Sequence, residues 1–225
     1  MFGFVGMGLG LISGALSTVS SAIVTACSAI GGAVISTGRI MIDAINRGLP
    51  MIEKICDVTL TLGKGLGLFS PEQNECDIYE LGMRTERSVE EGVHSEQFDS
   101  NQSYINHLRE QVTLSKANIE QLGNLSDSDK LKYACIGSAV TIAAINEKYE
   151  IDIPETFWIA GADLGVKSEQ FKPMLDVFEN AQITPDLEGF QKGELTSDLQ
   201  RSIYDLIDKR LGDVLSNETI DKLLG

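Results

Sequence analysis

The first charged residue of this chain is Arg39, so residues 1–38 carry only apolar, small and hydroxylated side chains. A helix that crosses a bilayer needs about 20 predominantly apolar residues, and this run is longer. Because backbone groups in lipid must be satisfied within their own segment, such a run is expected to be helical there. The run therefore predicts an N-terminal region that is buried in a membrane or in a tightly packed protein assembly.

Small residues recur inside this run at a constant interval. Gly6, Gly10 and Gly14 are four residues apart, and Thr18 continues the spacing. Small residues at i and i+4 let two helices approach closely in a membrane. We therefore expect this glycine face to mediate helix packing and self-association. Over residues 2–24 the composition is similar to that of fusion peptides and glycine-zipper pore formers, a resemblance that names no single family.

The pair Gly31-Gly32 is the predicted hinge of the region, because glycine destabilises a helix interior. It allows either one long helix that is kinked at the pair or a hairpin whose second arm covers residues 33–62. Pro50 is expected to kink that arm after Gly48. The second arm is amphipathic, so we expect it to lie at a membrane interface or to pack against the first arm and line a water-filled lumen. Its apolar face is predicted to contain Ile42, Ile45, Leu49 and Ile52.

Charge is distributed unevenly along the chain. The net charge is −15, whereas residues 1–70 hold four basic and three acidic side chains, a net of +1, which leaves −16 for the remainder. This shift predicts a hydrophobic, glycine-rich region over 1–70, an acidic linker over 71–101 and an acidic helical domain over 102–225. Nucleic acid is not an expected partner, because phosphate binding depends on clustered Lys and Arg side chains.

The remainder of the chain shows helical periodicity, so the predicted fold class is mostly α. The centre of one predicted helix, residues 134–145, is apolar on all sides and too short to span a bilayer, which predicts a buried central helix. Ser126 or Asp127 is expected to cap it. Trp158 is expected to pack in the core, with membrane-interface anchoring as the alternative. Helices are expected over 78–89, 104–122, 129–147, 168–181 and 197–215, with Pro173 expected to interrupt the fourth or to delay its start.

Motifs that carry chemistry are incomplete in this sequence. Gly63-Lys64-Gly65 lacks the other residues of a phosphate-binding loop, and Asp127-Ser128-Asp129 lacks those of a calcium loop. His94 is surrounded in sequence by carboxylates, without a zinc-binding pattern. We therefore expect no enzymatic activity, no cofactor and no metal. The four cysteines form no CxxC pair and are expected to be reduced: Cys27, Cys56, Cys76 and Cys135.

These features predict a non-enzymatic membrane-inserting protein that self-associates through Gly6, Gly10 and Gly14 and forms a pore or channel, as a toxin, an effector or a phage or secretion-system component. Its expected partners are a lipid bilayer and further copies of itself or other assembly subunits. The alternative is a structural subunit of a tail, tube or secretion apparatus, with the N-terminus buried against other subunits. Basic residues that follow the apolar run favour a cytoplasmic, aqueous location for the C-terminal domain: Arg39, Arg47, Lys54 and Lys64.

Overall fold

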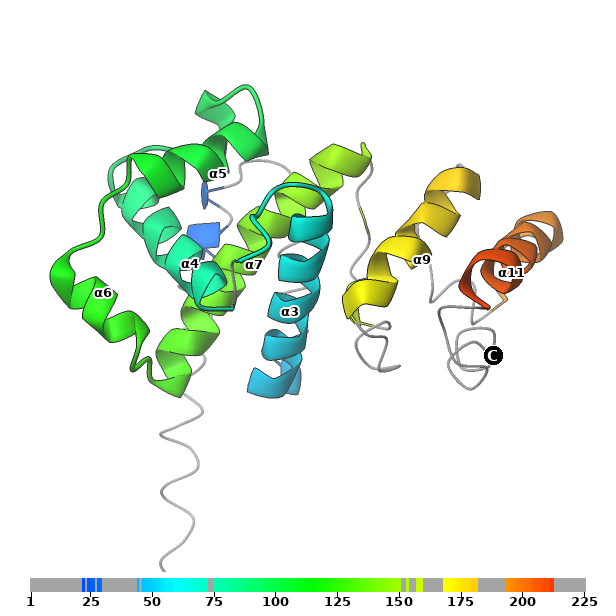
Figure 1. Ribbon diagram of the computed structural model, residues 1–225, viewed down its shortest axis with the longest axis horizontal. Coiled ribbons are helices and arrows are strands. Elements are labelled where there is room, and N and C mark those ends of the chain that lie inside the picture. Colours follow the sequence, from blue (N-terminus) through cyan, green and yellow to red (C-terminus); the bar gives the residue numbers. More distant parts are fainter. Residues whose placement is uncertain are drawn as a thin grey trace, which may run out of the picture.

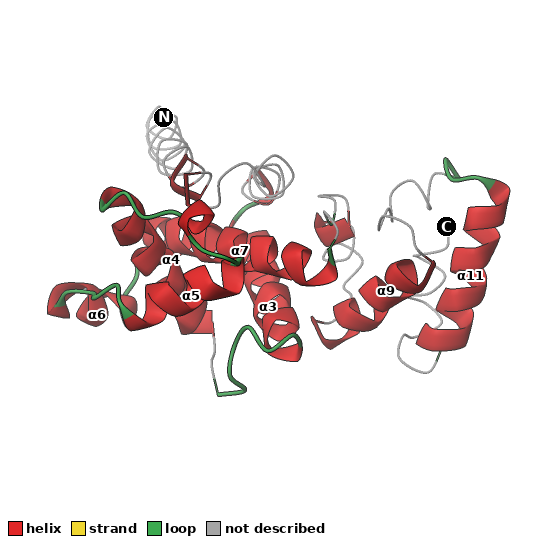
Figure 2. Cartoon of the chain, turned by 90° about the horizontal axis from the view of Figure 1, so that it is seen from above, coloured by secondary structure: helices red, strands yellow, loops and turns green. Residues whose placement is uncertain are grey.

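The computed structural model is a row of packed helices (Figures 1 and 2). Every regular element in the part of the chain that it describes is helical, which confirms the mostly-α prediction. The structure describes residues 22, 24–26, 28–29, 44, 46–72, 75–150, 153, 157–159, 168–181 and 193–212.

Helix α7 lies at the centre of the row, with α3, α4 and α5 packed against it; α9 packs against α3, and α11 packs against α9. Figure 1 shows this order, with α5 and α6 near one end and α11 at the other. The elements are α3 (Leu49–Gly65), α4 (Glu75–Glu90), the 3₁₀ turn η2 (Ser95–Gln97), α5 (Asn101–Glu110), α6 (Lys116–Leu122), α7 (Asp127–Tyr149), α9 (Ser168–Ala181) and α11 (Ser197–Leu211).

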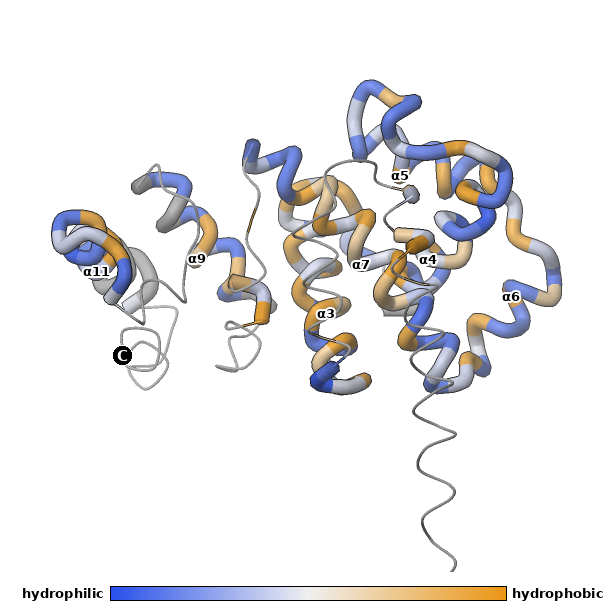
Figure 3. The backbone as a smooth tube through the Cα atoms, turned by 180° about the vertical axis from the view of Figure 1, so that it is seen from behind, coloured by the Kyte–Doolittle hydropathy of each residue, from blue (hydrophilic) through white to orange (hydrophobic). Residues whose placement is uncertain are grey.

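Helix α7 is the buried central helix that the sequence predicts. All thirteen residues from Tyr133 to Ile145 are buried. The backbone tube in Figure 3 is hydrophobic along much of α7 and of the neighbouring α3. The helix begins after Ser126, whose hydroxyl accepts a hydrogen bond from the Asp129 amide at 3.2 Å. This is the side-chain cap that satisfies a free N–H group at a helix start.

Two glycines allow α4 and α7 to cross at backbone contact. A Cβ atom added to Gly82 would lie 2.2 Å from the carbonyl oxygen of Tyr133, and one added to Gly137 would lie 2.1 Å from that of Ile78. Real Cβ atoms do not approach other atoms so closely, so the crossing requires glycine on both helices. Here the short distance between helices comes from sequence positions outside the N-terminal glycine series.

Helix α4 lies within residues 71–101, for which the sequence predicts an acidic linker. The helix predicted at 78–89 is present, extends over 75–90 and presents a buried face to the core it shares with α3 and α7. Average acidity hides the apolar stripe of this segment, which appears only at helical spacing. The buried residues on the described part of α4 are Ile78, Tyr79, Leu81, Gly82, Met83, Thr85 and Ser88.

The predicted helix over 104–122 is wrong as a single element. It ends at Glu110 as α5, and α6 begins after Ser115, where a capping box with Asn118 starts a new helix. Ile119, on α6, is 57% exposed. The break is stabilised from α4: the Arg84 guanidinium donates hydrogen bonds to the carbonyl oxygens of Leu108, Arg109 and Val112 at the end of α5.

The kink predicted at Pro50 in a continuous arm is not present. Pro50 lies instead in the first turn of α3. Gly48 precedes the helix with φ 96°, a left-handed conformation that favours glycine. Its amide also donates to the Ala44 carbonyl oxygen at 3.1 Å. A proline is tolerated in a first turn because the N–H groups there have no partner within the helix. The predicted kink is therefore a helix boundary at Gly48.

Trp158 lies in the core, as predicted. Its side chain is fully buried, and its ring stacks on Phe171 of α9 at 6.3 Å between centroids. Phe157 meets both rings edge-on. These contacts attach α9 to the residues that precede it. Pro173 lies inside α9, which continues through it from 168 to 181.

Candidate functional site

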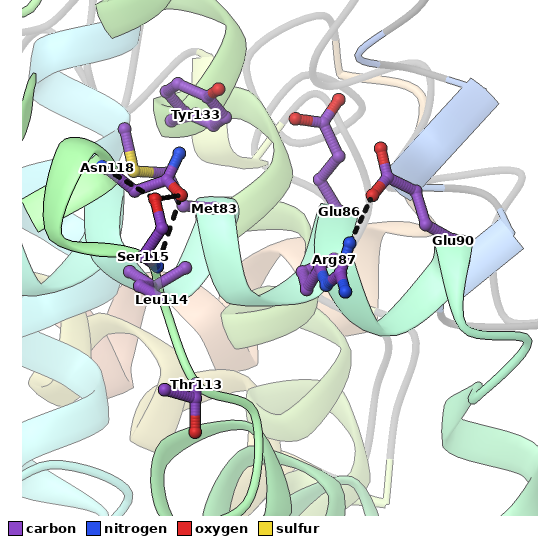
Figure 4. A pocket seen from close by; sticks show the side chains of 9 residues that line it. All are labelled: Met83, Glu86, Arg87, Glu90, Thr113, Leu114, Ser115, Asn118 and Tyr133. Carbon is purple, nitrogen blue, oxygen red and sulfur yellow. Dashed lines mark hydrogen bonds and ion pairs between the residues drawn. The ribbon is translucent and has the colours of Figure 1, made fainter.

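A half-open hollow of about 420 Å³ lies beside α4 (Figure 4). One wall is α4, the opposite wall is the connection from α5 to α6 together with the first turn of α6, and α7 contributes one tyrosine. The volume is within the range of small-molecule and side-chain binding sites. The lining residues are Met83, Glu86, Arg87, Glu90, Thr113, Leu114, Ser115, Asn118 and Tyr133.

The lining has an apolar part and a polar part. Met83, Leu114 and Tyr133 are buried, with 3%, 8% and 8% of their surface exposed, and form the apolar part. The carboxylates of Glu86 and Glu90 lie one helical turn apart on α4, on the same wall of the hollow (Figure 4). The site therefore offers apolar surface next to carboxylate oxygens.

Ion pairs orient the charged groups on the α4 wall. Lys132 on α7 pairs with Glu86 at 2.5 Å between Nζ and Oε1. Arg87 contacts two carboxylates, that of Glu91 at 2.8 Å and that of Glu90 at 3.5 Å. The Glu90 pair is thus the looser of the two, and its carboxylate can turn toward a ligand while Arg87 stays paired with Glu91.

The environment of the hollow shifts two pKa values. Burial raises the pKa of Tyr133, so its hydroxyl stays protonated at neutral pH. Burial alone would lower the pKa of Lys132, but the hydrogen bond and negative charge of Glu86 outweigh it and raise that pKa. The Lys132 ammonium also lies 5.0 Å from the centre of the Tyr133 ring. Lys132 is therefore a fixed cation behind Glu86 rather than a proton donor.

The opposite wall is held by the capping box of α6. The Ser115 hydroxyl accepts from the Asn118 amide at 3.1 Å, and the Asn118 side-chain oxygen accepts from the Ser115 amide at 3.3 Å. Because these two bonds are reciprocal, they fix both side chains at the helix start. The hollow therefore has preset polar groups on both walls.

Most of the predicted site residues lie outside the described residues. These are the packing glycines, the hinge pair and the first two positions of the amphipathic face: Gly6, Gly10, Gly14, Gly31, Gly32, Ile42 and Ile45. Leu49 and Ile52 lie in α3. Ile52 is 1% exposed and belongs to the core shared with α7, so at this position the apolar face contacts the helical bundle.

A face of alanines lies in the described part of the uncharged run. Ala22, Ala26 and Ala29 are helical and exposed by 0%, 4% and 0%, whereas Val24 is 65% exposed. These alanines belong to the same core cluster as α3 and α7. The sequence analysis did not predict this face. The series of small residues at four-residue intervals that includes Thr18 does continue to Ala22 and Ala26.

The remaining candidates for chemistry have structural roles in the described chain. Gly63-Lys64-Gly65 forms the last turn of α3, where the Gly63 backbone contacts the Phe69 ring. His107 packs its ring against Phe98 at 4.9 Å between centroids. Within the described residues, no group of three His, Cys, Asp or Glu side chains is arranged to hold a metal ion.

Two of the cysteines are buried thiols between α3 and α7. The Cys56 sulfur lies 3.3 Å from the Ser138 hydroxyl, and Cys135 is 1% exposed. Burial, with a contribution from the nearby Cys56, raises the pKa of Cys135. A thiol with a raised pKa is a poor nucleophile, because the thiolate is the reactive form. These cysteines therefore act as packing residues.

Across the described ranges, none of the helices has both the length and the apolar character needed to cross a bilayer. The chain matches no protein-family model, no curated protein sequence and no solved structure.

Proposed function

We propose that this is a non-enzymatic membrane-inserting protein that self-associates through Gly6, Gly10 and Gly14 and forms a pore or channel. The observation that carries the proposal is the absence of any charged residue before Arg39. Burying even one charge in a bilayer costs several kcal/mol, and this run contains none. The helical bundle, whose core includes Ala22, Ala26 and Ala29, remains in the aqueous phase and carries the glycine-rich start of the run at a membrane surface.

Helix geometry supports separate roles for the two small-residue faces. With 3.6 residues per turn, each residue rotates the helix by about 100°. On a straight helix, the alanine face (Ala22, Ala26 and Ala29) is then rotated by about 130° from the glycine face (Gly6, Gly10 and Gly14). The buried alanines contact the bundle of the same chain. On such a straight helix the glycine face would be directed away from that contact, and we expect it to pack against a second copy.

The test is dye release from liposomes by the full chain and by two leucine variants. Gly10→Leu places a large side chain on the glycine face and should strongly reduce leakage, because the helices can no longer approach closely. Gly8→Leu makes the same chemical change about 160° around a straight helix and should retain leakage. Equal leakage by the two variants would contradict the glycine-face mechanism.

The alternative is a subunit of a large assembly whose N-terminal segment is buried against other protein chains. The alanine face favours it, because part of the uncharged run already packs against protein. Sedimentation of the full chain in buffer without lipid or detergent distinguishes the two proposals. A single defined oligomer there supports the assembly subunit, and a species that becomes defined only with lipid supports membrane insertion.

A further inference from the structure

We propose that the hollow between α4, α6 and α7 binds an alkylammonium group, the chemistry of a lysine side chain or an aliphatic diamine. This inference goes beyond membrane insertion, since the hollow lies wholly within the bundle. The nine lining residues come from three separate parts of the chain, which are α4, the connection from α5 into α6, and α7. These parts meet only in the folded protein.

The charge around the hollow favours a cation over an anion. Three carboxylates, those of Glu86, Glu90 and Glu91, stand against the two cations Arg87 and Lys132, and both cations are already paired. An anion that approached Arg87 would meet Glu86 and Glu90 on the same wall. A cation instead meets the Glu90 carboxylate, whose contact with Arg87 is long at 3.5 Å. The chain as a whole has a charge of −15, which also attracts cations.

The shape and polarity of the lining favour an ammonium on an aliphatic chain. Met83, Leu114 and the Tyr133 ring provide apolar surface for methylene groups. An ammonium has three N–H donors. The Glu90 carboxylate is the charged acceptor on the α4 wall, and the hydroxyls of Thr113 and Ser115 are polar groups on the opposite wall, where Ser115 is bonded to Asn118 (Figure 4). A lysine side chain satisfies both requirements, since its stem is apolar and its end is a compact cation.

The experiment is an NMR titration of the ¹⁵N-labelled full chain with N-acetyl-lysine methylamide, cadaverine or N-acetyl-norleucine methylamide. The norleucine compound retains the apolar stem and lacks the ammonium. We expect saturable shifts of the Asn118 side-chain amide with the two amines and not with norleucine. A tighter response to the lysine compound indicates a peptide partner, whereas a tighter response to cadaverine indicates a free diamine; both support the alkylammonium site.

Two matched variants test the role of the carboxylate. Glu90→Gln removes the charge that faces the ligand and should raise the dissociation constant by about fivefold, the usual scale for a partly exposed ion pair. Glu96→Gln makes the same change at an exposed carboxylate outside the lining and should change it by less than about twofold. Both side chains are exposed, so neither variant should disturb folding. Equal binding of norleucine, no saturable shift with either amine, or unchanged affinity in Glu90→Gln would overturn the proposal.

Discussion

At the scale of single residues, Gly82 and Gly137 determine how closely α4 and α7 approach. Each glycine faces a backbone carbonyl of the other helix, so an added methyl group has no flexible side chain to displace. The two contacts lie four residues apart on α4, between Ile78 and Gly82, and four residues apart on α7, between Tyr133 and Gly137. The crossing is thus a continuous backbone contact one helical turn long.

Gly137→Ala should lower the free energy of unfolding by about 3 kcal/mol or more, at or above the upper end for overpacking, because the added Cβ would meet a carbonyl oxygen at 2.1 Å. Urea unfolding followed by circular dichroism measures the change. Gly123→Ala is the matched control, since its added Cβ would lie 3.8 Å from the nearest atom. It should change stability by less than about 0.5 kcal/mol. Similar losses in both variants would show that the close crossing is not the cause.

At the scale of elements, the buried threonines of α3, α4 and α7 are satisfied within their own helices. The hydroxyls of Thr59, Thr85 and Thr141 donate to carbonyl oxygens three or four residues earlier, at 2.9, 2.7 and 2.8 Å. These hydroxyls therefore add no hydrogen bond between helices, and at their positions the helices pack through shape and apolar area. The alanine face of the N-terminal segment uses the same kind of contact.

Ala26→Leu should weaken the contact of residues 22–29 with the bundle. A leucine at a position that is 4% exposed must displace packed neighbours, at a cost of about 1–3 kcal/mol. Amide hydrogen exchange should then become faster over residues 22–29. Val24→Leu, at a position that is 65% exposed, is the control and should leave exchange there unchanged. Unchanged exchange in both variants would mean that the alanine face does not secure the segment.

At the scale of the whole molecule, one core joins the three regions that the sequence separates. Buried residues of α3, from region 1–70, and of α4, from the predicted linker, belong to the same cluster as α7 from region 102–225. Core residues such as Ile52, Ile55 and Leu62 have little accessible surface. The predicted division at 70 and 101 is therefore not reflected in the packing.

A chain that begins at Pro71 should not fold cooperatively. It lacks α3, so the α7 surface around Ser138 and the facing surface of α9 lose their cover. A chain that begins at residue 44 keeps α3 and should retain a cooperative thermal transition. Circular dichroism during heating, together with binding of a hydrophobic dye, distinguishes the two. A sharp transition in the shorter chain would mean that α3 is dispensable to the core.

Alkaline pH should destabilise the fold in two steps. Burial raises the pKa of Cys135 and, with the negative charge of Asp176, that of Tyr149. In the unfolded chain these groups lose their protons near pH 8.5 and pH 10, while the folded chain keeps them. The free energy of unfolding should therefore fall above each of these values, by up to about 1.4 kcal/mol per pH unit for each group.

Tyr149→Phe measures the contribution of Tyr149 to the second step. It removes the ionisable hydroxyl that donates to Asp176 at 3.3 Å, so stability near pH 7 should fall slightly. The decline in the free energy of unfolding above pH 10 should become shallower, because unfolding of the variant releases one proton fewer. Urea midpoints measured from pH 7 to pH 11 test this. An identical alkaline slope in the variant would assign the decline to other groups.

The sequence alone determined those features that depend on local pattern. The mostly-α class, the buried central helix, the cap at Ser126 and the burial of Trp158 were all predictable, because periodicity, capping chemistry and continuous apolar character act within a few residues. The uncharged run before Arg39 is also a property of sequence alone, and its membrane role stays a prediction. The extent of the helix predicted at 168–181 matches α9.

Only the tertiary structure decided which faces found partners. The role of α4 in the core, the break between α5 and α6 and the hollow lined by Glu90 and Tyr133 each depend on residues far apart in sequence. Arg84 illustrates the reason: its guanidinium donates to carbonyl oxygens at the end of α5 that lie 24 to 28 residues further along the chain. Burial and hydrogen bonding of this kind depend on which helices pack against each other, and local sequence pattern does not predict those contacts.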